Sequence, residues 1–297
     1  MHVDNVSMDF IRKLENIQEL ATLPTVAFRI LELVEDPKAT MDDISQAVET
    51  DPSLTVKILR VANSPLYGFR TEISSVRQAI ISLGLNRISN IVVGVALFTK
   101  FFNTSARQNV HMREFWRHST STGIVAKSLA RRLKISFNER EFVGGLIHDI
   151  GKMVMIQYFP EQYDAVLNII RERQVRDVVA EREIFGVDHN VAGRALAKMW
   201  QLPADLTDVI ASHSTLPELS NARDITAVVR IADLLCEMWG ASSEEGILEL
   251  ELERERAWNV LANIRPELRD LDVEVFTFEL EQEFKKAELF INLMLGD

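Results

Sequence analysis

Residues 144–152 read Gly-Gly-Leu-Ile-His-Asp-Ile-Gly-Lys, and this stretch decides how the chain is interpreted. The apolar residues around it predict a helix that enters the core, so His148 and Asp149 are expected at its buried end. Adjacent helical residues diverge by about 100°, so the pair can share a ligand only at the helix end, where Gly151 can turn the chain. The two leading glycines would let another helix approach closely. An imidazole beside a carboxylate suits Zn, Mn or Fe better than Ca.

Working outward, four more residues on separate segments offer the same chemistry. His118 shares a helix face with apolar residues and is expected to point at the core, and Asp233 borders a buried apolar stripe. His189 begins a predicted helix and His213 ends another. Four histidines and two aspartates on different helices are the raw material of a carboxylate–imidazole metal cluster inside a helical bundle.

Each of these residues, taken singly, also has an ordinary structural interpretation. A core-facing His118 can be a buried histidine that hydrogen-bonds a backbone group. A helix C-terminus favours a protonated His213 without any metal. Asp233 can pair with Arg230 one turn earlier, and His189 can be a first-turn residue behind an N-cap. The joint pattern favours a shared site, and the single positions leave both alternatives open.

Helical periodicity runs through almost every segment, and strand signals are weak, so the predicted fold is all-α. Helix starts are marked by Thr40 with Asp43, by Asp51 with Pro52, and by Ser74 or Ser75. Asn86 is expected to cap an apolar helix that ends near residue 98. Further helices are predicted at 116–133, 138–148, 160–174, 177–185, 189–200, 204–213 and 223–239.

Composition narrows the class of protein. The chain has 297 residues, a formal net charge of -11 and one cysteine, Cys236, which rules out an intrachain disulfide. The first ten residues lack the basic and apolar regions of a signal peptide. The longest apolar run, 91–98, is far shorter than the roughly 20 residues that cross a bilayer. We therefore predict a cytoplasmic protein without a membrane segment.

The acidic charge is concentrated at the C-terminus. Residues 241–297 contain 15 acidic and 6 basic side chains, a net charge of -9, so the rest of the chain carries only -2. Two apolar stripes follow there, one at 247–261 and one at 276–294. These stripes need a partner surface, which is either the body of this chain or a second subunit. We expect three regions, 1–105, 106–240 and 241–297.

Several motifs occur in the order that is typical of one family. They are Leu23-Pro24-Thr25-Val26, Asp51-Pro52-Ser53-Leu54, Ala62-Asn63-Ser64-Pro65-Leu66-Tyr67-Gly68, Ala79-Ile80-Ile81-Ser82-Leu83-Gly84, the 144–152 stretch, Phe185-Gly186-Val187-Asp188-His189 and Trp200-Gln201-Leu202-Pro203. The chain thereby resembles the HDOD family (HD-related output domain) over roughly residues 20–240. HDOD modules are related to the HD superfamily of metal-dependent phosphohydrolases.

The resemblance implies an N-terminal helical subdomain (1–105) packed on an HD-like bundle (106–240), followed by the acidic helical extension. The HD ligand pattern maps to His118, His148, Asp149 and Asp233, with Fe, Mn, Ni or Zn as the implied divalent metal. HDOD modules act in bacterial signal transduction, so the chain is expected to be a stand-alone regulatory module. The alternative is an HD-type phosphohydrolase that acts on a phosphomonoester or a cyclic nucleotide.

The cyclic di-GMP phosphodiesterases named HD-GYP give a finer comparison. Lys152 matches a lysine of their motif, and His189 and His213 match two further metal ligands. In an enzyme, Asp149 would be both ligand and water-orienting base, and Lys152 a phosphate contact or a support of the ligands. Those enzymes carry a second histidine after the position of His213, where this chain has Ser214, and they continue with a Gly-Tyr-Pro loop that is absent here. A complete multinuclear site is therefore not expected, and catalysis is left undecided.

The predicted partners follow from the same reasoning. The loop with Asn63 and Tyr67 is a candidate contact surface for regulatory proteins, although Tyr67 can equally be a packing residue. A small phosphorylated or nucleotide ligand is the alternative partner, and a homodimer is one way to cover the apolar stripes of the extension. The helix at 52–63 offers only Lys57 and Arg60 for phosphate contacts, so nucleic-acid binding ranks last.

Overall fold

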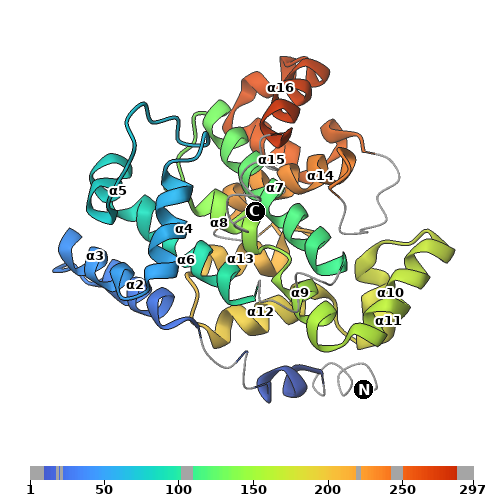
Figure 1. Ribbon diagram of the computed structural model, residues 1–297. Helices are drawn as coiled ribbons and strands as arrows, with labels where there is room; N and C mark the ends of the chain where they lie inside the picture. The colour runs from blue at the N-terminus through green and yellow to red at the C-terminus, as the bar shows by residue number, and fades with distance from the viewer. Residues whose placement is uncertain are drawn as a thin grey trace.

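The computed structural model describes residues 10–17, 20, 23–101, 110–218, 222–241 and 250–285. These residues form helices and connecting loops without a β-strand, which confirms the all-α prediction (Figure 1). None of the described helices combines the length and the apolar character that crossing a bilayer requires.

The N-terminal part of the chain surrounds one buried helix. After a short helical segment at 10–15, four helices gather about α6, as Figure 1 shows in blue and teal. The four are α2 (Thr25–Glu35), α3 (Met41–Glu49), α4 (Pro52–Ala62) and α5 (Val76–Leu83), and the buried helix is α6 (Leu85–Phe101). α6 in turn packs on α8, which belongs to the next part of the chain.

The described residues of the central bundle form eight helices. They are α7 (Val110–Arg132), α8 (Arg140–Ile147), α9 (Ile150–Tyr158), α10 (Pro160–Arg173), α11 (Asp177–Phe185), α12 (His189–Met199), α13 (Ala204–Ser212) and α14 (Arg223–Met238). α8 lies between α7, α14 and α13, while α9 packs on α12. The hairpin of α10 and α11 lies at the edge of this bundle in Figure 1.

The predicted helix starts are largely confirmed. Thr40 and Asp43 form a reciprocal capping box, and the Asp51 side chain accepts a hydrogen bond from the backbone N–H of Leu54. Ser75 caps α5. Asn86 is not the cap that we predicted, because α6 already begins at Leu85, and Asn86 lies inside its first turn.

The acidic extension packs on the bundle of its own chain. Its described part forms two 3₁₀ turns, Leu252–Arg254 and Pro266–Asp270, and the helices α15 (Arg256–Ile264) and α16 (Val273–Lys285). Trp258 and Phe276 are almost fully buried with α7 and α14 side chains, and each contributes about 2–3 kcal/mol through removal from water. The apolar positions predicted at 247–248 and 287–294 lie outside the described residues.

Two clusters of buried apolar side chains hold the fold together. One runs from the N-terminal helices through α6 into α8, α9, α10 and α12. The other joins α7 and α14 to the extension. The boundaries predicted at 105 and 240 fall in or beside segments outside the described residues, so the division into three regions stays a prediction.

Candidate metal centre

Six predicted side chains from five different places in the fold meet inside the bundle. His118 comes from the middle of α7, His148 follows the last residue of α8, and Asp149 lies between α8 and α9. The other three are His189, the first residue of α12, His213, directly after α13, and Asp233 in α14. None of the six has more than 1% of its surface exposed.

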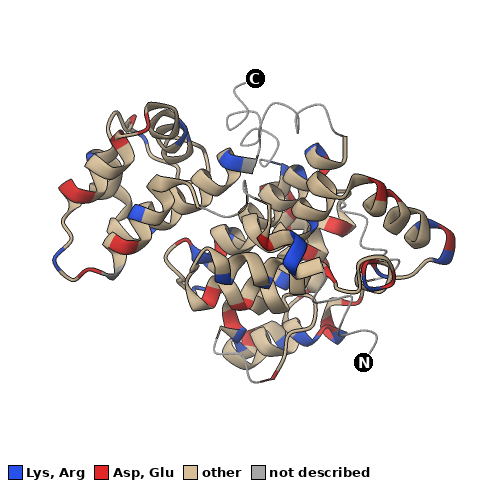
Figure 2. Ribbon diagram, turned by 90° about the horizontal axis from the view of Figure 1, so that it is seen from below, with Lys and Arg blue, Asp and Glu red and all other residues tan. Residues whose placement is uncertain are grey.

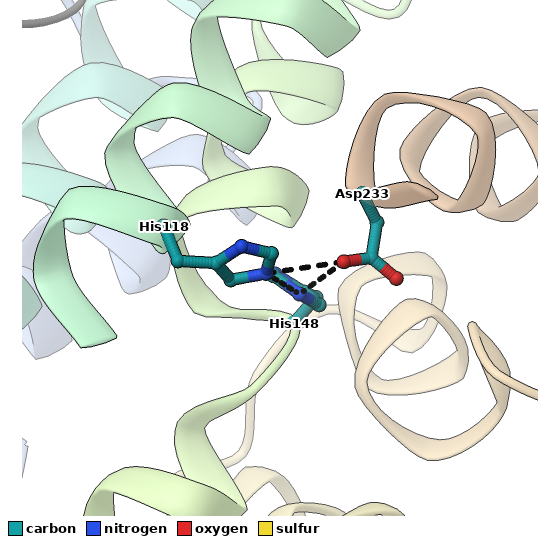
Figure 3. A group of neighbouring side chains, drawn as sticks. All are labelled: His118, His148 and Asp233. Atoms are coloured by element: carbon teal, nitrogen blue, oxygen red, sulfur yellow. Dashed lines mark hydrogen bonds and ion pairs between the residues drawn. The ribbon is translucent and has the colours of Figure 1, made fainter. Parts of the chain in front are cut away.

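The first half of the cluster contains His118, His148 and Asp233, which Figure 3 shows pointing toward one another from three elements. Asp233 Oδ1 is 3.1 Å from His118 Nε2 and 3.4 Å from His148 Nε2. The two Nε2 atoms are 3.2 Å apart. Asp149 Oδ2 completes this half at 3.5 Å from His148 Nε2 and 4.0 Å from His118 Nε2.

The second half of the cluster uses the other oxygen of Asp149. Asp149 Oδ1 is 3.2 Å from His213 Nε2 and 3.4 Å from His189 Nε2. The carboxylate of Asp149 therefore faces two groups of imidazoles with one oxygen each, which is an arrangement that can bridge two cations.

The hydrogen bonds of the four imidazoles fix their tautomers. The Nδ1 atoms of His118 and His148 lie 2.8 Å from the carbonyls of Ala241 and Gly145. Those of His189 and His213 lie 2.8 Å from a carboxylate oxygen of Glu181 and 3.2 Å from the Val209 carbonyl. Because all four partners only accept, each Nδ1–H donates, and in the neutral ring each Nε2 presents a lone pair to the centre of the cluster.

The inward atoms therefore need a cation. His189 Nε2, His213 Nε2, Asp149 Oδ1 and Asp233 Oδ1 are buried without a hydrogen-bond donor. Buried polar atoms without partners cost about 1–3 kcal/mol each, and converging lone pairs repel. A divalent ion bound by imidazole and carboxylate removes both costs, so the residues present fit such an ion.

The carboxylates buried around the imidazoles also favour a bound cation. Burial alone lowers the pKa of His118, but Asp233, whose Oδ1 is 3.1 Å from the His118 Nε2, and the charges of Glu237 and Asp149 raise it to about 10. Burial likewise lowers the pKa of His189, which the charges of Glu181 and Asp149 raise to about 10. The carboxylates thus favour positive charge beside the imidazoles, which protons or divalent cations can supply.

Close backbone packing places the ligands. A Cβ atom on Gly145 would lie 2.6 Å from the Cα of Gly123, so α7 and α8 touch through their glycines, as predicted for the 144–145 pair. Gly151 is not the residue at which the chain turns. The helix breaks at His148 and Asp149, and Gly151 lies inside α9, where its missing side chain lets α9 touch the backbone of His189 on α12.

For Asp233 and His189 the sequence left a structural and a metal-binding interpretation open. Asp233 does pair with Arg230 as the ordinary interpretation expected, with Nη1 2.7 Å from Oδ2, yet its other oxygen faces the imidazoles. Asp188 is the N-cap of α12, and its side chain accepts from the Val191 backbone N–H at 3.0 Å. His189 is nonetheless directed into the cluster, so the two interpretations are compatible.

The sequence reasoning missed two buried acids on α11. Glu181 accepts from His189, and Asp177 lies 2.8 Å from Lys152 Nζ, which is also 2.8 Å from Asp149 Oδ2. Lys152 is completely buried between these carboxylates. The available signal was the pair of acids at i and i+4 on the face that Ala180 and Phe185 share.

The position after His213 supports the packing of the cluster. Ser214 Oγ accepts a hydrogen bond of 2.7 Å from Asn190 Nδ2, and Asn190 follows His189. This bond joins the start of α12 to the end of α13, the two elements that supply the second pair of imidazoles. Ser214 thus has a structural contact at the position where the phosphodiesterases carry another histidine.

The predicted partner-binding residues lie away from the cluster. Asn63 closes its loop, because its side chain accepts from the Ile73 backbone N–H and donates to the Ile73 carbonyl at 2.7 and 2.8 Å. The Tyr67 hydroxyl donates to Glu139 at 2.9 Å, and Lys127 Nζ lies 3.4 Å from the centre of the Tyr67 ring. Both polar ends are engaged within the chain, and a partner-binding role for them stays a prediction.

Comparisons with known proteins agree with this architecture. The family model of the HDOD domain matches residues 20–216 of this sequence. A solved HDOD domain protein of unknown function from Geobacter sulfurreducens is 25% identical, with a TM-score of 0.81 over 98% of this chain and 97% of that one. A Shewanella amazonensis protein, provisionally named a metal-dependent phosphohydrolase, shares the fold at 20% identity and a TM-score of 0.63, with 96% and 99% of the chains covered.

A curated relative from Treponema pallidum (strain Nichols), called an uncharacterized protein, is 24% identical over 204 residues. The match spans 68% of this chain and 39% of that protein, so the chain corresponds to about two fifths of the relative's length.

Proposed function

Because the chain belongs to the HDOD family, we propose that it is a regulatory module built around a buried divalent-metal centre and acts by binding a protein or a small ligand. One observation carries this proposal: four imidazole Nε2 atoms converge on Asp149 and Asp233 while every Nδ1 is held by an acceptor. Such fixed tautomers are typical of metal-binding histidines.

The burial of the cluster favours regulation over turnover. All six side chains are at most 1% exposed, so a phosphoester cannot reach them in this conformation. A closed ligand shell stabilises a fold, whereas a catalytic metal keeps an open position for water or substrate. Metal binding in such a shell adds directly to folding stability and can report the metal state to a partner.

The residues assigned to catalysis have positions that suit support of the metal. Asp149 supplies one oxygen to each half of the cluster, and Lys152 holds its Oδ2 at 2.8 Å. The ammonium of Lys152 is also paired with Asp177, so we propose that it orients Asp149 instead of contacting a phosphate. Mixed imidazole and carboxylate donors suit Zn, Mn, Fe or Ni.

A metal-dependent phosphohydrolase is the second candidate. The placement of Asp149 between two pairs of imidazoles favours this candidate. Sites with two neighbouring metal ions are common in enzymes that hydrolyse phosphoesters. A divalent ion would lower the pKa of a bound water and polarise a phosphoryl oxygen. This candidate requires an opening movement that exposes the cluster.

Elemental analysis of the purified protein tests the proposal. We expect Mn, Fe, Ni or Zn in the wild-type protein and a lower metal content in His148→Ala, while His111→Ala serves as the matched control because His111 lies outside the cluster near Asp164. Phosphatase and cyclic-dinucleotide assays on the same samples separate the two candidates. Metal-free wild-type protein would refute the metal centre, and turnover that disappears in His148→Ala would favour the phosphohydrolase.

A further inference from the structure

Helix α11 turns two acids toward the metal centre. Asp177 and Glu181 lie one turn apart on the same face, and they are 2% and 0% exposed. Their neighbour Glu183 points outward and pairs with Arg173 at the surface. Burying two carboxylates on a short helix at the edge of the bundle is costly unless both are paired, so their partners indicate what this face of α11 does.

Glu181 holds His189 by two bonds to one oxygen. Its Oε2 accepts from the His189 ring Nδ1–H and from the His189 backbone N–H, both at 2.8 Å. The two bonds fix the ring at the start of α12 and direct Nε2 toward Asp149 Oδ1, 3.4 Å away. A carboxylate on Nδ1 also makes the imidazole a stronger ligand.

This support is specific to one imidazole. The Nδ1 atoms of the other three rings are held by backbone carbonyls, those of Ala241, Gly145 and Val209. The Nδ1 partner of His189 is instead a side chain, that of Glu181, which belongs to α11, the second helix after α9 in the chain. Of the four ligand imidazoles, His189 is therefore the one whose orientation depends on α11.

Asp177 gives α11 a second link to the cluster, through the carboxylate of Asp149 that both halves share. Its Oδ2 and Asp149 Oδ2 are each 2.8 Å from Lys152 Nζ, so the ammonium group joins α11 to the bridging carboxylate. Asp177, Glu181 and the Nδ1 of His189 could by themselves surround a cation. Lys152 already supplies the positive charge there, which makes this group a support for the ligands instead of a third metal position.

We infer that Glu181 is a positioning residue for a second metal position, formed by Asp149, His189 and His213, and that occupancy of this position is coupled to the docking of α11 on the bundle. The inference rests on the proposed metal centre and adds a regulatory element to it. The first position, formed by His118, His148, Asp149 and Asp233, has no contact with Glu181 among the described interactions and is expected to fill independently.

Metal titration of the folded protein tests the inference. Apo protein is titrated with Mn²⁺ or Zn²⁺ by calorimetry, and bound metal is counted by elemental analysis. We expect two ions in the wild type. Glu181→Ala should retain the first ion and bind the second 10- to 100-fold more weakly, the usual effect of removing such a support. Glu183→Gln, on the opposite face of the same helix, should behave like the wild type.

Hydrogen exchange supplies a readout that is independent of activity. Metal should slow the exchange of amides 177–185 in the wild type, and this slowing should disappear in Glu181→Ala and in His213→Ala, which removes a ligand without touching α11. Glu181→Gln keeps an acceptor oxygen and serves if the alanine variant does not fold. It should bind the second ion with an affinity between those of the wild type and the alanine variant.

The outcomes separate this inference from the proposed function. Wild-type protein that binds no metal refutes the metal centre and with it the inference. A single ion in the wild type, or two ions bound with unchanged affinity by folded Glu181→Ala and Glu181→Gln, overturns the inference and leaves the metal centre standing. Metal-independent exchange of 177–185 in the wild type would overturn the coupling to α11.

Discussion

Replacing Gly151 by alanine should separate α9 from α12, whose N-terminal ends hold the ligands Asp149 and His189. The new Cβ atom would lie 2.8 Å from the carbonyl carbon of His189, and its nearest neighbours are backbone atoms that cannot rotate away. Carbon atoms pack at about 3.5–4.0 Å, so this contact alone requires α9 and α12 to move apart by about 0.7–1.2 Å, and the carbonyl oxygen of His189, which is closer still, requires at least as much. Alanine gains about 1 kcal/mol of helix propensity, which offsets part of an overpacking cost of about 1–3 kcal/mol.

The effect on metal binding should exceed the effect on stability. Metal–ligand distances tolerate only about 0.2 Å, so a shift of this size moves His189 out of reach of an ion shared with Asp149. Gly144→Ala is the matched control, because its Cβ would meet only side-chain atoms, the closest being Val229 Cγ2 at 3.3 Å. Urea unfolding and metal content measure both effects. Equal stability and equal metal content in the two variants would refute the packing argument.

Three further predictions concern stability. Chelation should lower the urea midpoint of the wild type more than that of His148→Ala, since an ion present at 100 times its Kd adds about 2.7 kcal/mol; equal shifts would contradict this. Tyr67→Phe should cost about 1–2 kcal/mol by removing the hydrogen bond to Glu139, and an unchanged midpoint would show that the bond contributes nothing. Burial and the charge of Glu139 raise the pKa of Glu141 from 4.5 to about 7, so its destabilising effect is absent below pH 4.5 and complete above pH 7. Glu141→Gln should therefore stabilise the protein by roughly 2–3 kcal/mol at pH 8 and by little at pH 4.5, in urea unfolding at both values, and a pH-independent difference would contradict the burial argument.

The fold was largely predictable because local signals and the hydrophobic pattern agree. The helix predicted at 177–185 has the bounds Asp177–Phe185, and the capping box at Thr40 starts α3 as expected. Asn86 failed as a cap because the preceding glycine, with φ of 92°, already ends α5, and the next helix follows without a spacer. Gly84 and Asn86 are both residue types that can precede a helix, and the sequence alone does not show which of them does.

The candidate site was predictable only as a set of residue types. The six side chains were named from their spacing and their family pattern, and the fold brings them together. Their supports were not foreseen, because a carbonyl such as that of Ala241 has no sequence signature, and Glu181 looks like any acid on an exposed helix. Gly151 was placed at a turn, since the sequence cannot show that α12 passes within contact of α9.

The acidic extension has a closer relation to the metal centre than its charge suggested. Ala241, its first residue, holds Nδ1 of His118, and Arg117 donates to the neighbouring Gly240 carbonyl at 3.2 Å. Farther along, α15 and α16 bury their apolar faces against α14 and α7, the helices that carry Asp233 and His118. Figure 2 shows acidic and basic residues interspersed on the helices, and Arg131 of α7 pairs with an acid of α16 at 3.6 Å. The apolar packing of the extension thus joins two helices that carry ligands, so the extension supports the first metal position much as α11 supports the second.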